Sequence, residues 1–165
     1  MIILFIFAVL LPLYTSPMAP VVEKQRSQNI YYDKLEKIRE CAQTPGFDIN
    51  ALDKKKNTFL ILTTAINARN PAKEAIINEL LSHPNIDIDH QNIYGNTALI
   101  FASTFGEIEI VKKLVERGAN PFIKNLHQAT ARDWAANPEI KYHLRSYEVF
   151  YAQARPEFYK ELVLW

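Results

Sequence analysis

The chain has 165 residues, a length typical of a single domain, and it carries 19 Lys and Arg residues against 18 Asp and Glu residues. The resulting net charge of +1 gives no general argument for a nucleic-acid partner or an acidic membrane surface, so we expect no nucleic acid. The single cysteine, Cys41, excludes an internal disulfide framework and a cysteine-based zinc site.

The N-terminus forms a segment of its own, because residues 1–22 carry no charged side chain and Ile2 to Leu11 are all apolar. An apolar run of this length matches the core of a signal peptide and is shorter than the roughly 20 residues of a membrane-spanning helix. No Lys or Arg precedes the run, so three interpretations stay open: a signal peptide cleaved on export, an uncleaved membrane anchor, and a cytoplasmic protein. A membrane partner is expected only if the segment is uncleaved. Residues 23–30 are polar without periodicity and are predicted to be a linker.

The next segment predicts an amphipathic helix. Its apolar residues recur at spacings of 4, 3 and 4 residues: Tyr31, Leu35, Ile38 and Ala42. This spacing places all of them on one helix face. Pro45 and Gly46 then end the helix.

The rest of the chain contains one segment three times. Each copy opens on a threonine, and Thr58, Thr97 and Thr130 are 39 and 33 residues apart. In the middle copy, Thr97 suits a helix start, Gly106 suits the tight turn between two antiparallel helices, and Gly118 suits the end of the second helix. That second helix is predicted to bury one face, formed by Ile110, Val111, Leu114 and Val115.

A period near 33 residues with a threonine at the start of a helix pair resembles the ankyrin repeat family. The four glycines all fall on loop positions of that family: Gly46, Gly95, Gly106 and Gly118. The resemblance implies an all-α fold, an ankyrin-repeat helical solenoid with short β-hairpin fingers, over residues 31–151. Its implied parts are an N-terminal half repeat that caps the array (31–52), three repeats (about 53–91, 92–124 and 125–151) and a C-terminal cap or tail (152–165).

All three copies depart from the family pattern. No copy keeps the Pro and His of the family's Thr-Pro-Leu-His, and Lys56 stands where a hairpin glycine is expected. The first repeat also has about six extra residues, mostly Asn67 to Lys73. We interpret this insertion as a surface bulge, and a functional loop is the alternative.

The last copy is degenerate. Residues 130–136 predict a short first helix, and Asn137-Pro138 can begin a second one, because Pro suits a first helical turn. The second helix carries an apolar stripe and is expected to cap the array: Ile140, Leu144, Tyr147 and Tyr151. A final apolar stripe either folds back on this cap or meets a partner: Phe158, Leu162 and Trp165.

No catalytic arrangement is visible in the sequence. The four histidines have none of the spacings of a metal site: His83, His90, His127 and His143. Neither a Gly-rich phosphate loop nor a nucleophile motif is present. Glu107 and Glu109 are interpreted as exposed carboxylates that complement the dipole of a helix start. We therefore expect a protein that is not an enzyme and that binds no cofactor, metal or small-molecule substrate.

In ankyrin repeats the hairpin tips and the first-helix surface face the partner, so the resemblance also implies a set of binding residues. Carried onto this chain, the set is Lys54, Lys55, Asn57, Ile93, Tyr94, Asn96, Thr104, Phe105, Leu126 and His127. Tyr94 and Phe105 are unusually apolar for positions that meet water, and both partner binding and internal packing stay open for them. Packing between repeats is the interpretation of three further residues: Leu62, Phe101 and Trp134.

Two hypotheses of function follow. The first is a non-catalytic protein–protein interaction module that binds an unidentified protein through the hairpin tips and the concave groove. The alternative is a membrane-associated structural or assembly factor that acts through an N-terminal anchor and an apolar C-terminal tail. Because one fold serves many functions, the resemblance gives no partner identity.

Overall fold

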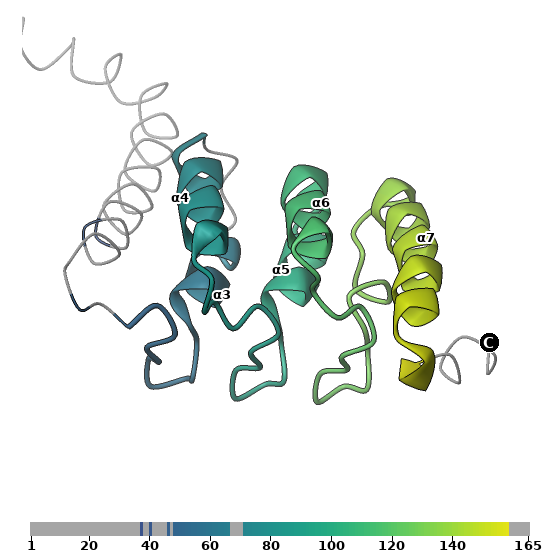
Figure 1. The fold of residues 1–165 in the computed structure, drawn as a ribbon, viewed down its shortest axis with the longest axis horizontal. Coiled ribbons are helices and arrows are strands. Elements are labelled where there is room, and N and C mark those ends of the chain that lie inside the picture. The colour runs from purple at the N-terminus through teal and green to yellow at the C-terminus, as the bar shows by residue number, and fades with distance from the viewer. Residues whose placement is uncertain (1–36, 38–39, 41–45, 47, 67–70, 159–165) are drawn as a thin grey trace, which may run out of the picture.

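The computed structural model describes residues 37, 40, 46, 48–66 and 71–158. Within these ranges the elements are α3 (Phe59–Thr64), α4 (Pro71–Ser82), α5 (Ala98–Thr104), α6 (Ile108–Glu116), α7 (Pro138–Ala154) and the 3-10 helix η2 (Pro156–Phe158). Figure 1 shows α4, α6 and α7 side by side in one row. The shorter helices α3 and α5 pack against α4 and α6 as the first helices of their repeats. This arrangement is the helical solenoid that the sequence predicts.

The predicted threonine caps are present at the starts of α3 and α5. The Thr58 hydroxyl oxygen accepts a hydrogen bond from the Ile61 N–H at 3.3 Å. Thr97 accepts one from the Ile100 N–H, also at 3.3 Å. Each Thr thus satisfies one of the N–H groups that a helix start leaves without a partner.

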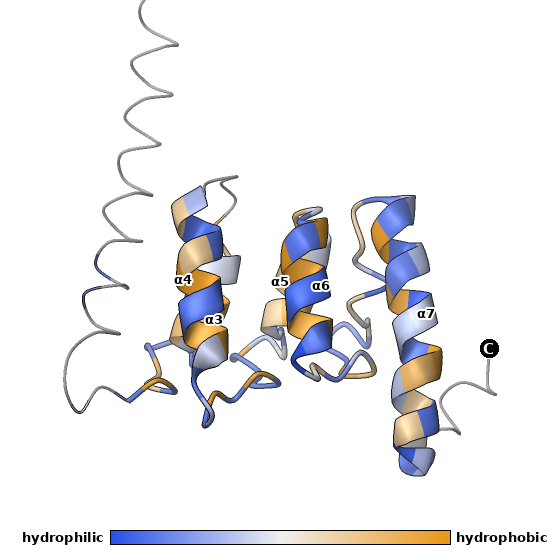
Figure 2. Cartoon of the chain, turned by 45° about the horizontal axis from the view of Figure 1, so that its top comes forward, coloured by the Kyte–Doolittle hydropathy of each residue, from blue (hydrophilic) through white to orange (hydrophobic). Residues whose placement is uncertain are grey.

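The hydrophobic core lies between the helices of neighbouring repeats. All four residues predicted for the buried face of α6 are at most 5% exposed: Ile110, Val111, Leu114 and Val115. In α7, Ile140, Leu144 and Tyr151 are buried, and Tyr147 packs against the core from a half-buried position. Figure 2 shows the resulting alternation of hydrophobic and hydrophilic residues along these helices. The helical apolar pattern therefore identified the buried faces of α6 and α7 correctly.

The loops between the repeats are tight turns. Each closes with a backbone hydrogen bond between its ends: Asp53 N–H to Asn57 C=O (3.1 Å), Asn92 N–H to Asn96 C=O (3.1 Å) and Asn125 N–H to Ala129 C=O (3.0 Å). No β-strand occurs among the described residues. The fingers predicted as short β-hairpins are therefore hairpin-shaped turns, because too few of their residues pair to form strands.

The last repeat lacks its predicted first helix. The prediction of a helix over 130–136 is wrong, because this segment contains only a turn. The Asp133 carboxylate closes the turn by accepting hydrogen bonds from the N–H and the hydroxyl group of Thr130, both at 2.8 Å. Pro138 disfavours a helical conformation at Asn137, which is extended and caps the start of α7. Any helix over this segment would therefore have to end before Asn137.

Two charged residues are buried where the sequence suggested exposure. Lys73, interpreted as part of a surface bulge, has only 1% of its side chain exposed. Glu107, interpreted as an exposed carboxylate, has 7% of its side chain exposed, and its Oε2 lies 2.8 Å from Lys73 Nζ. Exposure is thus the wrong interpretation for these two side chains, because they pair with each other between repeats; residues 67–70 of the predicted bulge lie outside the described ranges. Glu109 is exposed, as the sequence indicated.

Several predictions concern residues outside the described ranges. They include the signal peptide or anchor over 1–22, the linker over 23–30, most of the half-repeat helix and the apolar tail beyond residue 158. These stay predictions. Within the described ranges, no helix is both long enough and apolar enough to cross a membrane.

Candidate functional site

Three loops project together from one end of the helix rows (Figure 1). We call residues 53–57, 92–96 and 125–129 the first, second and third finger. Backbone hydrogen bonds join neighbouring fingers: the Ile93 N–H donates to the Lys55 C=O at 3.0 Å, and the Leu126 N–H donates to the Tyr94 C=O at 3.1 Å. The three fingers therefore form one continuous surface.

Each finger is shaped by an Asp or Asn at its first position. The Asp53 Oδ1 atom accepts hydrogen bonds from the N–H groups of Lys55 and Asn57, both at 2.8 Å. The same pair of bonds occurs in the other fingers: Asn92 with Tyr94 and Asn96 (3.0 and 3.1 Å), and Asn125 with His127 and Ala129 (3.0 and 3.3 Å). These side chains hold the backbone of each finger in its turn without a strand partner.

A second set of side-chain bonds crosses between the fingers. The Asn92 amide donates to the Asn57 Oδ1 atom at 2.9 Å, and the Asn125 amide donates to the Asn96 Oδ1 atom at 2.8 Å. We call these four residues the asparagine ladder. The ladder ends at the third finger, because Ala129 has no side-chain amide with which to continue it. Two of the predicted binding residues, Asn57 and Asn96, thus hold the stack together, and Asn57 is only 9% exposed.

The second and third fingers approach each other closely at Gly95. A Cβ atom added there would lie 2.9 Å from both the Asn125 Cα and the Leu126 nitrogen, and the φ of Gly95 is +73°. Glycine accepts both conditions without strain. The corresponding residues of the other fingers, Lys56 and Gln128, also have positive φ, at 55° and 58°. The turn is therefore the same in all three fingers, although only one carries glycine.

Six of the predicted binding residues are exposed on the fingers: Lys54, Lys55, Ile93 (43%), Tyr94 (48%), Leu126 (69%) and His127. Single exposed apolar side chains are common on protein surfaces. Ile93, Tyr94 and Leu126, however, lie on fingers that are bonded to each other. The three exposed apolar side chains therefore lie on two neighbouring fingers that a backbone hydrogen bond joins.

Trp134 lies beside His127 of the third finger, and the sequence did not predict its exposure. It is 42% exposed, and its ring lies edge-on to the ring of His127, with 6.1 Å between centroids. The interpretation as packing between repeats is wrong for Trp134, whereas Leu62 and Phe101 do pack against the core. The reason is that the first helix of the last repeat is reduced to a turn. Pro138, which follows closely in the sequence, was the feature from which the loss of this helix could have been predicted.

Thr104 and Phe105 lie at the end of α5 that is opposite the second finger. The Thr104 hydroxyl donates to the Ile100 C=O at 2.8 Å. Phe105 is half-buried and stacks on Phe101, with 6.2 Å between ring centroids. The structure therefore does not bring these two predicted residues together with the fingers.

Charge is distributed unevenly over the fingers. Lys54, Lys55 and Lys56 are all exposed on the first finger, whereas the second finger has no charged side chain. Burial raises the pKa of the Asp53 carboxyl, but hydrogen bonds from Asn57 and Lys55 outweigh this effect and hold the pKa below its ordinary value of 3.8. The Asp53 carboxylate is thus ionised in the finger at neutral pH.

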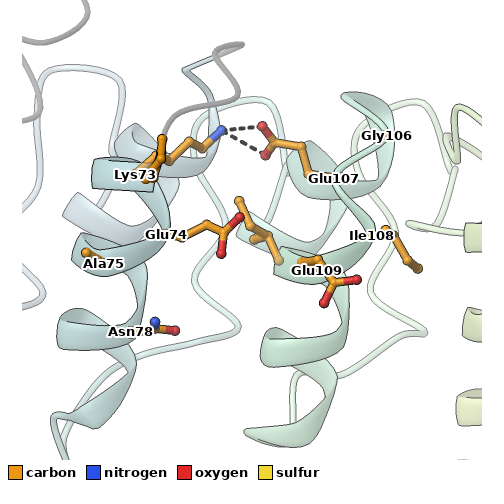
Figure 3. A pocket seen from close by; sticks show the side chains of 10 residues that line it. Lys73, Glu74, Ala75, Asn78, Gly106, Glu107, Ile108 and Glu109 are labelled. Carbon is orange, nitrogen blue, oxygen red and sulfur yellow. Dashed lines mark hydrogen bonds and ion pairs between the residues drawn. The ribbon is translucent and has the colours of Figure 1, made fainter.

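Two grooves lie elsewhere on the array. One of about 750 Å³ separates the starts of α4 and α6, beside the buried pair of Lys73 and Glu107 (Figure 3). The other, of about 450 Å³, lies between α6 and α7 and is lined by Tyr147, Phe150 and Tyr151 among others. Over the part of the chain that the structure describes, no three His, Cys, Asp or Glu side chains are placed to hold a metal ion.

Comparison with known protein families decides the assignment. The family described as ankyrin repeats matches residues 29–125, in three copies. The chain belongs to the ankyrin repeat family. Ankyrin repeats are generally protein–protein interaction modules, and proteins of the family are generally non-catalytic. The fingers are thus the loops that join successive ankyrin repeats.

One relative and one solved structure illustrate the likeness. The chain is 38% identical over 77 residues to an ankyrin repeat protein of Rickettsia bellii (strain RML369-C). That match covers 45% of this chain and 46% of the relative, so the chain spans about half the length of the relative that it matches. It is also similar to the crystal structure of the ankyrin repeat domain of Bcl-3, described as a unique member of the IkappaB protein family, with 31% identity and a TM-score of 0.55. This likeness covers 61% of this chain and 42% of that one.

Proposed function

We propose that this ankyrin array binds another protein through its finger face. The finger face is the set of exposed side chains on and beside the fingers: Lys54, Lys55, Ile93, Tyr94, Leu126, His127 and Trp134. The observation that carries the proposal is the group of large apolar side chains exposed on fingers that are bonded to each other. Exposed apolar side chains that gather on one part of a surface are typical of protein-binding sites.

The exposed side chains of the finger face and the ordered backbone beneath them both favour binding. Tyr94 and Trp134 are 48% and 42% exposed, and Tyr and Trp are among the residues that most often dominate the free energy of protein association. The asparagine ladder and the bonds within each finger fix the backbone beneath them. A surface that is already ordered loses little conformational entropy when a partner binds. The finger face is therefore suited to bind without rearrangement.

Affinity capture with matched variants tests this proposal. Tyr94→Ala/Leu126→Ser removes two exposed apolar side chains outside the core, so the protein should fold like the wild type and lose at least one partner. The control, Tyr142→Ala/Phe150→Ala, removes side chains that are 77% and 65% exposed on α7. Circular dichroism checks the fold, and quantitative mass spectrometry compares the proteins captured from native cells. If the finger variant retains every partner of the wild type, the finger face is not the binding surface.

We also propose that the array acts outside the cytoplasm or at a membrane surface. The proposal rests on the uncharged, apolar segment within residues 1–22, which lies outside the described residues. The intact mass of the protein from fractionated native cells tests it. A mass lacking roughly the first 16–22 residues indicates export, and the full mass in the membrane fraction indicates a tether. The full mass in the soluble fraction would rule out both locations.

A membrane tether also bears on the second hypothesis of function. If the full-mass protein lies in the membrane fraction and the finger variant captures the same proteins as the wild type, a structural or assembly role at the membrane replaces partner binding by the fingers.

A further inference from the structure

We infer that the partner segment on the finger face combines an acidic stretch with an apolar stretch, and that its acidic stretch lies on the first finger. The inference rests on the proposed function. It adds the composition of the partner segment and states which of its two stretches lies on the first finger. It follows from the way charge and apolar surface are divided among the three fingers.

The first finger is basic. Lys54, Lys55 and Lys56 are consecutive and exposed, and within the described residues none of them forms an ion pair with a carboxylate. The carboxylate of this finger, Asp53, accepts hydrogen bonds from the backbone of its own finger and from the Asn57 amide. The finger as a whole keeps a net charge of +2. A segment rich in carboxylates is the electrostatic complement of such a surface.

The second and third fingers are apolar instead. Neither contains an Asp, Glu, Lys or Arg residue, and their exposed side chains include Ile93, Tyr94 and Leu126, with Trp134 beside them. The charged residues that flank the third finger in the sequence largely offset one another: Lys124 and Asp133 are exposed with opposite signs, and Arg132 pairs with Glu148 at 3.2 Å. Apolar side chains of a partner are therefore favoured at this end of the finger face.

The order of the two surfaces is fixed by the structure. The bonds from Ile93 to Lys55 and from Leu126 to Tyr94 hold each finger against the next. A segment that spans the finger face therefore meets the lysines first, then the Ile-Tyr tip, and finally Leu126 and Trp134. A segment bound with its apolar stretch on the first finger would instead place its carboxylates on the apolar fingers, which costs desolvation without a compensating charge.

Two anionic ligands of other classes are less well matched to this surface. A nucleic acid or an anionic lipid surface carries phosphate charge along its whole length, and binding it draws on several basic groups spread over the contact. Among the three fingers, lysine or arginine occurs only in the first, and the chain has a net charge of only +1. A protein segment with charge at one end fits better.

Panning a displayed library of random 12-residue peptides on the full-length protein tests the inference. We expect the enriched peptides to combine an acidic cluster with an apolar cluster. Their affinity, measured by fluorescence anisotropy with synthetic peptides, should fall about tenfold or more in Lys54→Glu/Lys55→Glu. The control, Lys141→Glu/Arg145→Glu, makes the same change in net charge at two exposed positions of α7 and should bind like the wild type.

Zero-length carbodiimide coupling then tests the direction of the bound peptide. The reagent joins a carboxylate to a nearby lysine amine as an amide, and mass spectrometry locates the link. We expect the acidic cluster of the peptide to couple to Lys54 or Lys55. Coupling to Lys124, next to the third finger, would overturn the proposed direction.

The possible failures are distinguishable. Enriched peptides that lack an acidic cluster but lose binding in Tyr94→Ala/Leu126→Ser overturn the inference and leave the proposed function standing. Enriched peptides that are indifferent to both finger variants overturn both. The absence of enriched peptides overturns the inference. If phosphatidylserine vesicles or a single-stranded RNA then bind the wild type but not Lys54→Glu/Lys55→Glu, the first finger is assigned to an anionic ligand of that class.

Discussion

Lys73 and Glu107 join two ankyrin repeats through a buried ion pair. Lys73 Nζ lies 2.8 Å from both carboxylate oxygens of Glu107 (Figure 3), and the two side chains are 1% and 7% exposed. Lys73 also donates hydrogen bonds to the backbone carbonyl groups of Thr64, at 3.1 Å, and Ile66. Burial lowers the pKa of Lys73, while the hydrogen bond and charge of Glu107 act in the opposite direction. One ammonium group thus links the end of α3, the start of α4 and the start of α6.

Removing only one partner of this pair should destabilise the array strongly. Lys73→Met leaves the Glu107 carboxylate buried without its cation and also removes the donor for the Thr64 and Ile66 carbonyl groups. We expect the free energy of unfolding, measured by urea denaturation, to fall by about 3–5 kcal/mol. Lys73→Met/Glu107→Leu should recover much of this loss, because no uncompensated charge remains.

The exposed pair of Lys112 and Glu109 provides the control. Their N–O distance is 2.9 Å, but the side chains are 39% and 60% exposed. Lys112→Met should therefore leave the midpoint of urea denaturation close to that of the wild type, because exposed ion pairs contribute little to stability. Similar losses for Lys73→Met and Lys112→Met would show that burial of the first pair has no special effect on stability.

Gly95→Ala should destabilise the contact between the second and third fingers. The added Cβ would lie 2.9 Å from backbone atoms of Asn125 and Leu126 at a positive φ, so we expect a loss of about 2–4 kcal/mol in urea denaturation. Gly118→Ala is the control, because its φ is also positive but no other described atom lies within 4 Å of the added Cβ. We expect it to cost about 1–2 kcal/mol. If both variants lose the same free energy, the fingers are not in close contact at Gly95.

The arrangement of the helices could be predicted because it depends on local chemistry. Thr58 and Thr97 cap helices with their own hydroxyl groups, and Gly118 ends α6 at a positive φ of 90°. The apolar stripes of α6 and α7 follow from helical periodicity alone. Each of these features is set within a few residues of the chain.

Features that depend on distant partners could not be predicted. A lysine near the start of a helix is usually exposed, and the burial of Lys73 depends on Glu107, which lies 34 residues away. Asn57 occupies a typical contact position, but its side chain bonds to Asn92 in the next finger. Trp134 matches an inter-repeat packing position, yet the missing helix of the last repeat leaves it exposed. The exposed residues at the finger tips could thus be predicted from the sequence. The side-chain contacts that hold the fingers and the repeats together could not.

Asp53→Asn should show how the first finger responds to acid. The folded-state pKa of Asp53 is below its ordinary value of 3.8, so its contribution to stability is fully present above pH 3.8 and is lost as the pH falls through the folded-state value. We expect the variant to be less stable than the wild type by about 1 kcal/mol at neutral pH, because the bond from the Asn57 amide to Oδ2 is lost. Urea denaturation from pH 7 down to pH 3 should show this difference shrinking below pH 3.8. A constant difference would mean that Asp53 is not held by these bonds.

Leu114→Ala tests the packing of the repeats. Leu114 is fully buried in α6, so its truncation should lower the free energy of unfolding by about 2–5 kcal/mol. Val149→Ala is the control, because Val149 is 43% exposed on α7 and should cost less than about 1 kcal/mol. Thermal unfolding followed by circular dichroism measures both. A Leu114→Ala protein that melts like the wild type would be incompatible with this core.

Site-specific photo-crosslinking in native cells tests most directly whether the finger face binds a protein. A photoreactive phenylalanine analogue replaces Tyr94 in one protein and Tyr142 in another, since these side chains are 48% and 77% exposed on different parts of the array. We predict that the analogue at Tyr94 crosslinks to a partner protein and that adding Leu126→Ser abolishes the adduct. The analogue at Tyr142 should give no such adduct. Crosslinks from Tyr142 together with none from Tyr94 would contradict the proposal that the fingers are the binding surface.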